Sequence, residues 1–386
     1  MKRGFAILIA VMLLNLADAK PYFMSFYGLN LNINVDDLPL MKLSTEVSQV
    51  EFNDFVLVVR NSPWDVAFDQ LSAQADEILL DDFGRFNMYK KFVIGQGKGM
   101  NTAVIKGLVY VALRKDKLDA KLANNLSFME IYIAMNAISD EGYSFLRDGK
   151  VYYSTNPTGG HPAQIQVLFD SINDNNVRKF DLNLKVIPKL GDKTKSRNLI
   201  YLSKNRVYKA NVKYNEYYVN YLNDMPNLEL GGQLLSAAVQ NHMYKDLDDS
   251  IEVWTKTMNG TQKQNFLLSF VQFAFPYKAD FDYRLREKRN TVVQSLADEF
   301  IDCEDKAVIF LFLVRRYTNT EGVLLFNKKE KHVNCALELP INAASYSFKY
   351  QGKKYTMAEP SFQGYKLSET DYNGSQILES KVIFKE

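Results

Sequence analysis

The residues best suited to chemistry are a cysteine, a histidine and a glutamate in the last third of the chain. Cys303 opens an apolar stretch with the pattern of a helix, His332 follows on a strand-like segment, and Glu359 ends a later strand-like segment. A thiol becomes a nucleophile when a base takes its proton, and an acid on the other ring nitrogen orients that base. The order predicts nucleophilic acyl chemistry, with Cys303 as nucleophile, His332 as base and Glu359 as orienting acid.

The position of Cys303 supports this interpretation. Asp302 is available as a helix cap, and a helix N-terminus carries unpaired N–H groups and about half a positive charge, which favours a thiolate. Glu304 and Asp305 are also good first-turn residues, so the same run suits a purely structural helix. If Glu359 points elsewhere, Asn334 is the alternative third member, or there is none.

This run resembles the core motif of the transglutaminase-like, papain-related superfamily: an Asp-Cys-Glu-Asp helix start, then a histidine on a strand, then an acid at the end of the next. The resemblance extends from Phe266 to about Ser375, and the layout of the whole chain is similar to that of exported bacterial members. It implies an α+β catalytic domain with helices packed on an antiparallel sheet, and a triad of Cys303, His332 and Glu359. It also implies Gln272 as an oxyanion donor, together with the backbone N–H of Cys303.

The chain departs from the family pattern at several positions. Ile301 stands where a glycine usually precedes the Asp-Cys pair, and residues 293–296 lack the usual proline and glutamate. The acid is a glutamate rather than the commoner aspartate. No departure removes a reacting group, but the first two bear on access to the thiol.

These features predict a thiol-dependent acyl-transfer enzyme acting on amide bonds, with a protein, peptide or cell-wall peptide as substrate. Hydrolysis, as by a cysteine peptidase or amidase, is favoured over cross-linking because water is generally available. The alternative is a non-catalytic envelope binding or scaffold protein that keeps the fold. No cofactor is implied, and the sequence leaves the oligomeric state and the exact substrate open.

Other reactive side chains lack the spacing of a site. The histidines His161, His242 and His332 are far apart, and no paired-cysteine or His-Glu-x-x-His spacing occurs, so no metal site is predicted. The Gly-rich run at 95–99 lacks the Gly-Lys-Ser/Thr of a phosphate loop. Cys335 should point away from the face that presents His332 and pack structurally, with a regulatory disulfide to Cys303 as the minority alternative.

The N-terminus has the pattern of a secretory signal peptide. Lys2 and Arg3 precede an apolar run and the small residues of Ala17-Asp18-Ala19, which predicts cleavage near Ala19/Lys20 and a periplasmic or secreted protein. The run has about 10 residues where a membrane span needs roughly 20, so no span is expected in the mature chain.

Composition indicates a folded protein without a nucleic-acid footprint. The 386 residues are 47% hydrophobic and 13% aromatic, and the formal net charge of +2 comes from interspersed basic and acidic residues. Only two cysteines are present, too few for the disulfide framework of many secreted domains. Nucleic-acid binding is therefore disfavoured.

Hydrophobic periodicity predicts a mixed α/β-rich region at 20–225 and the catalytic domain at 226–386. Within the first region, residues 55–59 and 217–222 are expected as strands, and 127–138 as a helix. Asp148-Gly149 is expected as a hairpin turn, because this pair supplies the positive φ that tight hairpins need. A capping box is expected at Thr261 and Gln264. The helix at 127–138 and the strands after it echo the helix that Cys303 begins, which suggests a degenerate, inactive copy of the catalytic core around 101–156.

Overall fold

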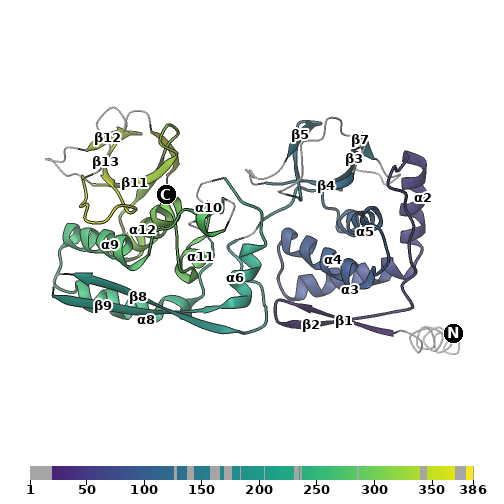
Figure 1. The fold of residues 1–386 in the computed structure, drawn as a ribbon, viewed down its shortest axis with the longest axis horizontal. Coiled ribbons are helices and arrows are strands. Elements are labelled where there is room, and N and C mark those ends of the chain that lie inside the picture. Colours follow the sequence, from purple (N-terminus) through teal and green to yellow (C-terminus); the bar gives the residue numbers. More distant parts are fainter. Residues whose placement is uncertain are drawn as a thin grey trace, which may run out of the picture. The chain divides into compact units, whose positions relative to one another are not determined.

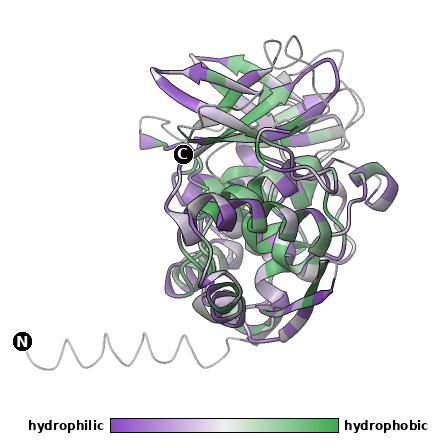
Figure 2. Ribbon diagram, turned by 90° about the vertical axis from the view of Figure 1, so that its left-hand side faces the viewer, coloured by the Kyte–Doolittle hydropathy of each residue, from purple (hydrophilic) through white to green (hydrophobic). Residues whose placement is uncertain are grey.

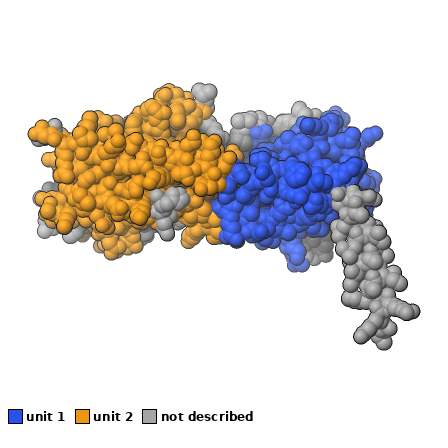
Figure 3. All heavy atoms as spheres, turned by 90° about the horizontal axis from the view of Figure 1, so that it is seen from below, with its two compact units in different colours: residues 1–183, 188–191 blue, residues 184–187, 192–386 orange. Residues whose placement is uncertain are grey.

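The chain has a mixed α+β fold whose sheets are antiparallel. The computed structural model describes residues 20–125, 128–136, 143–156, 166–168, 176–182, 184–203, 205–229, 234, 237–284, 287–339, 346–369 and 380–385. They form two compact units, coloured separately in Figure 3: unit 1 comprises residues 1–183 and 188–191, and unit 2 comprises 184–187 and 192–386. This division differs from the predicted one near 226, because residues 192–225 belong to unit 2. The predicted signal peptide at 1–19 lies outside the described residues.

Unit 1 begins with a two-stranded hairpin, continues with four helices and ends with a five-stranded sheet of order β5-β6-β4-β3-β7 (Figure 1). Its elements are β1 (Lys20–Phe26), β2 (Leu29–Val35), α2 (Gln49–Arg60), α3 (Pro63–Glu77), α4 (Asp82–Gln96), α5 (Thr102–Lys115), β3 (Ala120–Asn125), β4 (Phe128–Ala134), β5 (Ser144–Arg147), β6 (Lys150–Ser154) and β7 (Gln166–Leu168).

Two sequence predictions for unit 1 are corrected and one is confirmed. Residues 55–59 lie in α2, where Ser48 caps the helix by accepting from the N–H of Glu51, and residues 128–134 form the strand β4. Short apolar runs do not distinguish helix from strand by periodicity alone, which explains both errors. The Asp148-Gly149 turn does join β5 to β6, and both turn residues have positive φ.

Unit 2 contains a long hairpin, six helices and a five-stranded sheet of order β12-β13-β11-β10-β14, counted over its described residues. Its elements are β8 (Thr194–Ser203), β9 (Arg206–Asn215), α6 (Glu216–Asn223), α8 (Asn241–Thr255), α9 (Gly260–Ala274), α10 (Asp280–Tyr283), α11 (Val292–Ala297), α12 (Cys303–Thr318), β10 (Gly322–Asn327), β11 (His332–Glu338), β12 (Ser347–Tyr350), β13 (Lys353–Ala358) and β14 (Lys381–Lys385).

Two further predictions for unit 2 are corrected. Residues 217–222 lie in the helix α6, not in a strand. The capping box at the start of α9 is formed by Asn259 and Gln262, two residues earlier than predicted. Asn259 outcompetes Thr261 because its side chain sits where the chain still has extended backbone, which the N-cap position requires.

Helix α12 is the core of unit 2. It packs against α9, α11 and the strands β10 and β11, and almost every residue from Cys303 to Val314 is buried. Figure 2 shows apolar residues concentrated on the helices that lie against the sheet. Gly322, at the start of β10, makes this close packing possible, because a Cβ there would lie 2.4 Å from Cδ2 of Leu311 on α12.

The two units share a topology. In each, a helix (α5 or α12) packs on the first two strands of the sheet that follows it, and the strand order in chain sequence is third, fourth, second, first, fifth. The repeated arrangement therefore begins at α5. The sequence pattern instead predicted the first helix of the degenerate copy at residues 127–138. The first residue of α5 is Thr102, where α12 has Cys303.

Among the described residues, no helix has both the length and the apolar character needed to cross a membrane.

Candidate active site

Cys303 is the first residue of α12 and is buried, with 7% of its surface exposed. Asp302 is the N-cap, and its side chain accepts from the backbone N–H of Asp305. The thiol Sγ donates to Oε2 of Glu304 at 3.0 Å, and the backbone N–H of Val333 reaches the sulfur. The thiol therefore lies at the start of β11, next to the residue that follows His332.

The pKa of Cys303 is raised, which reverses the expectation of a thiolate. Burial is the largest cause, followed by the negative charges of Glu304 and Asp302 and by the hydrogen bond to Glu304. The helix N-terminus offers about half a positive charge, and two nearby carboxylates in a water-poor site outweigh it. In this arrangement Cys303 is a protonated thiol.

His332 and Glu359 are brought together as the sequence proposed. Nε2 of His332 lies 3.0 Å from Oε2 of Glu359, whose side chain is fully buried. The pair forms because β11 and β13 are antiparallel neighbours, so the start of one strand and the residue after the other meet at the same edge. Glu359 also accepts from the N–H of Ser361 at 3.0 Å, and the His332 ring stacks on Phe362.

The Cys303 thiol and the His332 imidazole are not hydrogen-bonded to each other. In the described part of the chain, the side-chain hydrogen bond of Cys303 goes to Glu304. Among the described residues the carboxyl group that contacts His332 is that of Glu359, the first choice for the third member over Asn334.

Gln272 does not have the geometry of an oxyanion donor. Its Nε2 donates to the carbonyl oxygens of Glu359, at 2.8 Å, and Tyr365, at 3.0 Å, and its Oε1 accepts from the N–H of Gly364. Both amide hydrogens are thus used on backbone carbonyls. Gln272 instead holds the segment that follows β13, and with it Glu359, against α9.

Lys306 is a site residue that the sequence analysis missed. It lies one turn after Cys303 on α12 and is only 1% exposed, with Nζ donating to the carbonyl oxygen of Gln272 at 3.1 Å. Burial lowers its pKa to about 8, while the charge of Glu359 acts in the opposite direction. A lysine inside an otherwise apolar helix, in the run Cys-Glu-Asp-Lys-Ala, was the available indication.

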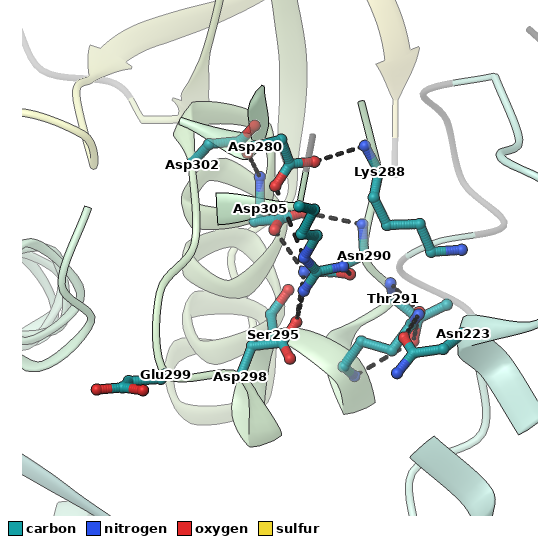
Figure 4. Close-up of polar contacts among 12 residues, drawn as sticks. Asn223, Asp280, Lys288, Asn290, Thr291, Ser295, Asp298, Glu299, Asp302 and Asp305 are labelled. Carbon is teal, nitrogen blue, oxygen red and sulfur yellow. Dashed lines mark hydrogen bonds and ion pairs between the residues drawn. The ribbon is translucent and has the colours of Figure 1, made fainter. Parts of the chain in front are cut away.

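Several carboxyl groups gather at the N-terminal end of α12. Figure 4 shows Asp280, Asp302 and Asp305 at the N-terminal end of α12, and Asn290 donates to both oxygens of Asp305. Burial is the largest cause that raises the pKa of Asp280 to about 6 and that of Asp302 to about 11. Asp302 is therefore held protonated at neutral pH, whereas Asp280 ionises just below neutral pH.

Three carboxyl groups of this region converge closely enough to be compared with a metal site. Oxygens of Glu287, Asp302 and Glu304 lie within 4.8 Å of one another. The spacing of these residues in the sequence did not predict this group, because Glu287 comes from the loop before α11. Acidic groups of this kind are common without an ion, and Glu304 is already engaged by the thiol.

Cys335 and the two other histidines complete the set of side chains that the sequence singled out. Cys335 is a free, buried thiol whose Sγ donates to the carbonyl oxygen of Ala358, so it packs structurally and forms no disulfide with Cys303. His161 lies outside the described residues, and His242 belongs to α8.

No family model, no curated protein and no solved structure matches this chain.

Proposed function

We propose that unit 2 is a thiol-dependent acyl-transfer enzyme of the transglutaminase-like, papain-related kind, acting on amide bonds through Cys303, His332 and Glu359. The observation that carries the proposal is the 3.0 Å contact between His332 and the fully buried Glu359, beside a thiol in the first turn of α12. A buried carboxylate on one ring nitrogen holds the imidazole in a fixed tautomer and orientation.

The reaction would proceed by proton transfer and nucleophilic attack. Because Glu359 engages Nε2, the thiol proton passes to Nδ1 of His332 as the sulfur turns from Glu304 toward the ring. The sulfur attacks the amide carbon, and the backbone N–H of Cys303 supports the oxyanion. The imidazolium then gives its proton to the leaving amine, which departs and leaves a thioester on Cys303.

Water or an amine completes the reaction. Water attacks the thioester with His332 as base and releases a carboxylic acid, whereas an amine gives a new amide. We favour hydrolysis, with a protein, peptide or cell-wall peptide as substrate. The proposal includes export directed by residues 1–19.

An acylation assay tests the proposal. The protein without residues 1–19 is mixed with p-nitrophenyl acetate, nitrophenol release is followed, and the acetylated residue is located by mass spectrometry. We expect an acetyl thioester on Cys303, absent in Cys303→Ala and formed at least about 100-fold more slowly in His332→Ala, the typical size of general-base assistance. Cys335→Ala is the matched control and should acetylate at the wild-type rate.

A second candidate function is a non-catalytic envelope binding or scaffold protein that retains the fold. The raised pKa of Cys303 and its hydrogen bond to Glu304 favour it, because a protonated thiol facing a carboxylate is a poor nucleophile. If the folded protein acetylates no faster than the unfolded chain, and His332→Ala changes nothing, this second function replaces the first.

A further inference from the structure

A cavity of about 360 Å³ adjoins the candidate site. It is lined by Tyr277, Lys306, Ser361, Phe362 and Gln363. Phe362 stacks on the ring of His332 with centroids 5.6 Å apart, and Lys306 lies one helical turn beyond Cys303. The cavity is therefore within reach of a small group attached to a carbonyl under attack by the thiol.

The lysine in this cavity lacks an ionic partner. No carboxylate of the described residues lies within ion-pair distance of Lys306, and its one side-chain hydrogen bond goes to the carbonyl of Gln272. An ammonium has three donors, so two remain. The charge of Glu359 favours the ammonium without forming an ion pair with it, and buried cations are normally paired directly.

A second polar group in the cavity is also unsatisfied. Ser361 is 8% exposed, and its hydroxyl oxygen is buried without a hydrogen-bond partner among the described residues. Its backbone N–H is used on Glu359. Tyr277 and Phe362 supply aromatic walls, so the polar groups are few and close to the reaction centre.

We propose that this cavity is a specificity pocket for a carboxylate on the acyl part of the substrate, with Lys306 and Ser361 as its donors. The inference rests on the proposed function. One carboxylate oxygen accepts a hydrogen bond from the Lys306 ammonium, and the other accepts one from the Ser361 hydroxyl. A neutral substrate group would not supply a negative charge to pair with the ammonium. The substrate class is thus an amide whose acyl side carries an acidic group.

The acidic residue beside the thiol disfavours the wrong placement of such a substrate. Oε2 of Glu304 lies 3.0 Å from the thiol sulfur, and its charge raises the pKa of Cys303. A substrate carboxylate placed near Glu304 would be repelled, so it binds on the side of Lys306. A preference for anionic reagents at Cys303 is therefore diagnostic, because Glu304 on its own would produce the opposite preference.

Two alkylating reagents of similar size measure this preference. Iodoacetate and iodoacetamide both transfer their carbon to sulfur with loss of iodide, and they differ in carrying a carboxylate or a neutral amide. The ratio of their rates at Cys303 is measured at pH 7 in a Cys335→Ala background and divided by the same ratio for glutathione. Thiol reactivity cancels in this ratio, so it remains informative even if the acetylation test fails.

We expect the normalised ratio to favour iodoacetate and to fall about tenfold in Lys306→Met, equivalent to about 1.4 kcal/mol. Ser361→Ala, a smaller change that should leave the fold intact, should lower the ratio in the same direction. Lys278→Met removes a nearby cation that does not line the pocket and should leave it unchanged. The proposal is overturned if the normalised ratio is one or less and does not change in a folded Lys306→Met variant.

Discussion

The side chain next to the nucleophile controls its protonation. Glu304 contacts the thiol directly at 3.0 Å, and its charge and hydrogen bond both raise the pKa of Cys303. The structure therefore represents a resting arrangement in which the proton is shared with a carboxylate rather than with His332. The proposed reaction requires the thiol to exchange Glu304 for His332 as its partner.

Neutralising Glu304 should release the thiol. In Glu304→Gln the repulsive charge is lost, so the pKa of Cys303 falls, and iodoacetamide alkylation at pH 7 should speed up at least about tenfold. The measurement is the pH dependence of the alkylation rate. Glu299→Gln, an exposed glutamate before the same helix, is the control. An unchanged profile in Glu304→Gln would remove Glu304 from this role.

Gln272 offers a test between a positioning and a catalytic role. In Gln272→Met the carbonyls of Glu359 and Tyr365 lose their donor, so the free energy of unfolding should fall by about 1–3 kcal/mol, the cost of unsatisfied buried groups. Urea unfolding and the acetylation rate are measured together. A slower rate with unchanged stability would instead restore the oxyanion role.

At the scale of elements, the contact between α12 and β10 depends on a missing side chain. A Cβ at Gly322 would lie 2.4 Å from Cδ2 of Leu311 and 3.1 Å from the carbonyl oxygen of Ala336. Gly322→Ala should lower the free energy of unfolding by about 1–3 kcal/mol through overpacking. Gly260→Ala is the matched control, since nothing lies within 4 Å of its added Cβ at the start of α9. Equal urea midpoints for the two variants would contradict the packing argument.

The start of α12 also makes stability depend on pH. Burial is the main cause that raises the pKa of Asp280 to about 6 and that of Glu287 to about 7. Because the folded protein then binds protons more tightly than the unfolded chain, this stabilisation is complete below the ordinary carboxyl pKa of about 4. It is lost as the pH rises through about 7.

Replacing Glu287 should reduce that loss. Glu287→Gln cannot ionise, so its melting temperature relative to wild type should increase between pH 5 and pH 8 as the wild-type carboxyl group gives up its proton. Thermal unfolding at several pH values measures the difference, with the exposed Glu299→Gln as control. A difference that stays constant with pH would show that Glu287 carries no such shift.

At the scale of the whole molecule, the hairpin β8–β9 and α6 belong with the catalytic unit. Arg197 on β8 donates to the carbonyl oxygens of Ser295, Leu296 and Glu299, just before α12. Gln294 on α11 donates to Asn223 at the end of α6. These contacts support the segment from which Cys303 emerges, so the unit should not be stable without them.

Two fragments test this division. Residues 184–386 should fold cooperatively and acetylate at Cys303 like the longer chain, whereas residues 226–386 lack β8, β9 and α6 and should not fold. Circular dichroism, thermal unfolding and the acetylation assay compare them. A stable, reactive 226–386 fragment would favour the boundary that composition alone suggested.

The sequence alone determined the chemistry of the proposed triad but not its protonation. Local sequence patterns mark where helices and strands begin and end. They therefore predicted Cys303 at a helix start, His332 on a strand and Glu359 at a strand end. They also predicted most strands of the second sheet. Short apolar runs such as 55–59 and 217–222 were assigned as strands because their length and hydrophobicity fit either state, and tertiary packing selects the helix.

Only the tertiary structure decided what surrounds the nucleophile. The partners of Gln272, the burial of Lys306 and the acidic groups around Asp302 all come from segments distant in sequence, and electrostatic effects depend on distance and burial in space. The shared strand order of the two units is likewise a property of pairing, which periodicity does not encode. Sequence therefore supplied the candidate reacting groups, and the fold determined that the Cys303 thiol is protonated against Glu304.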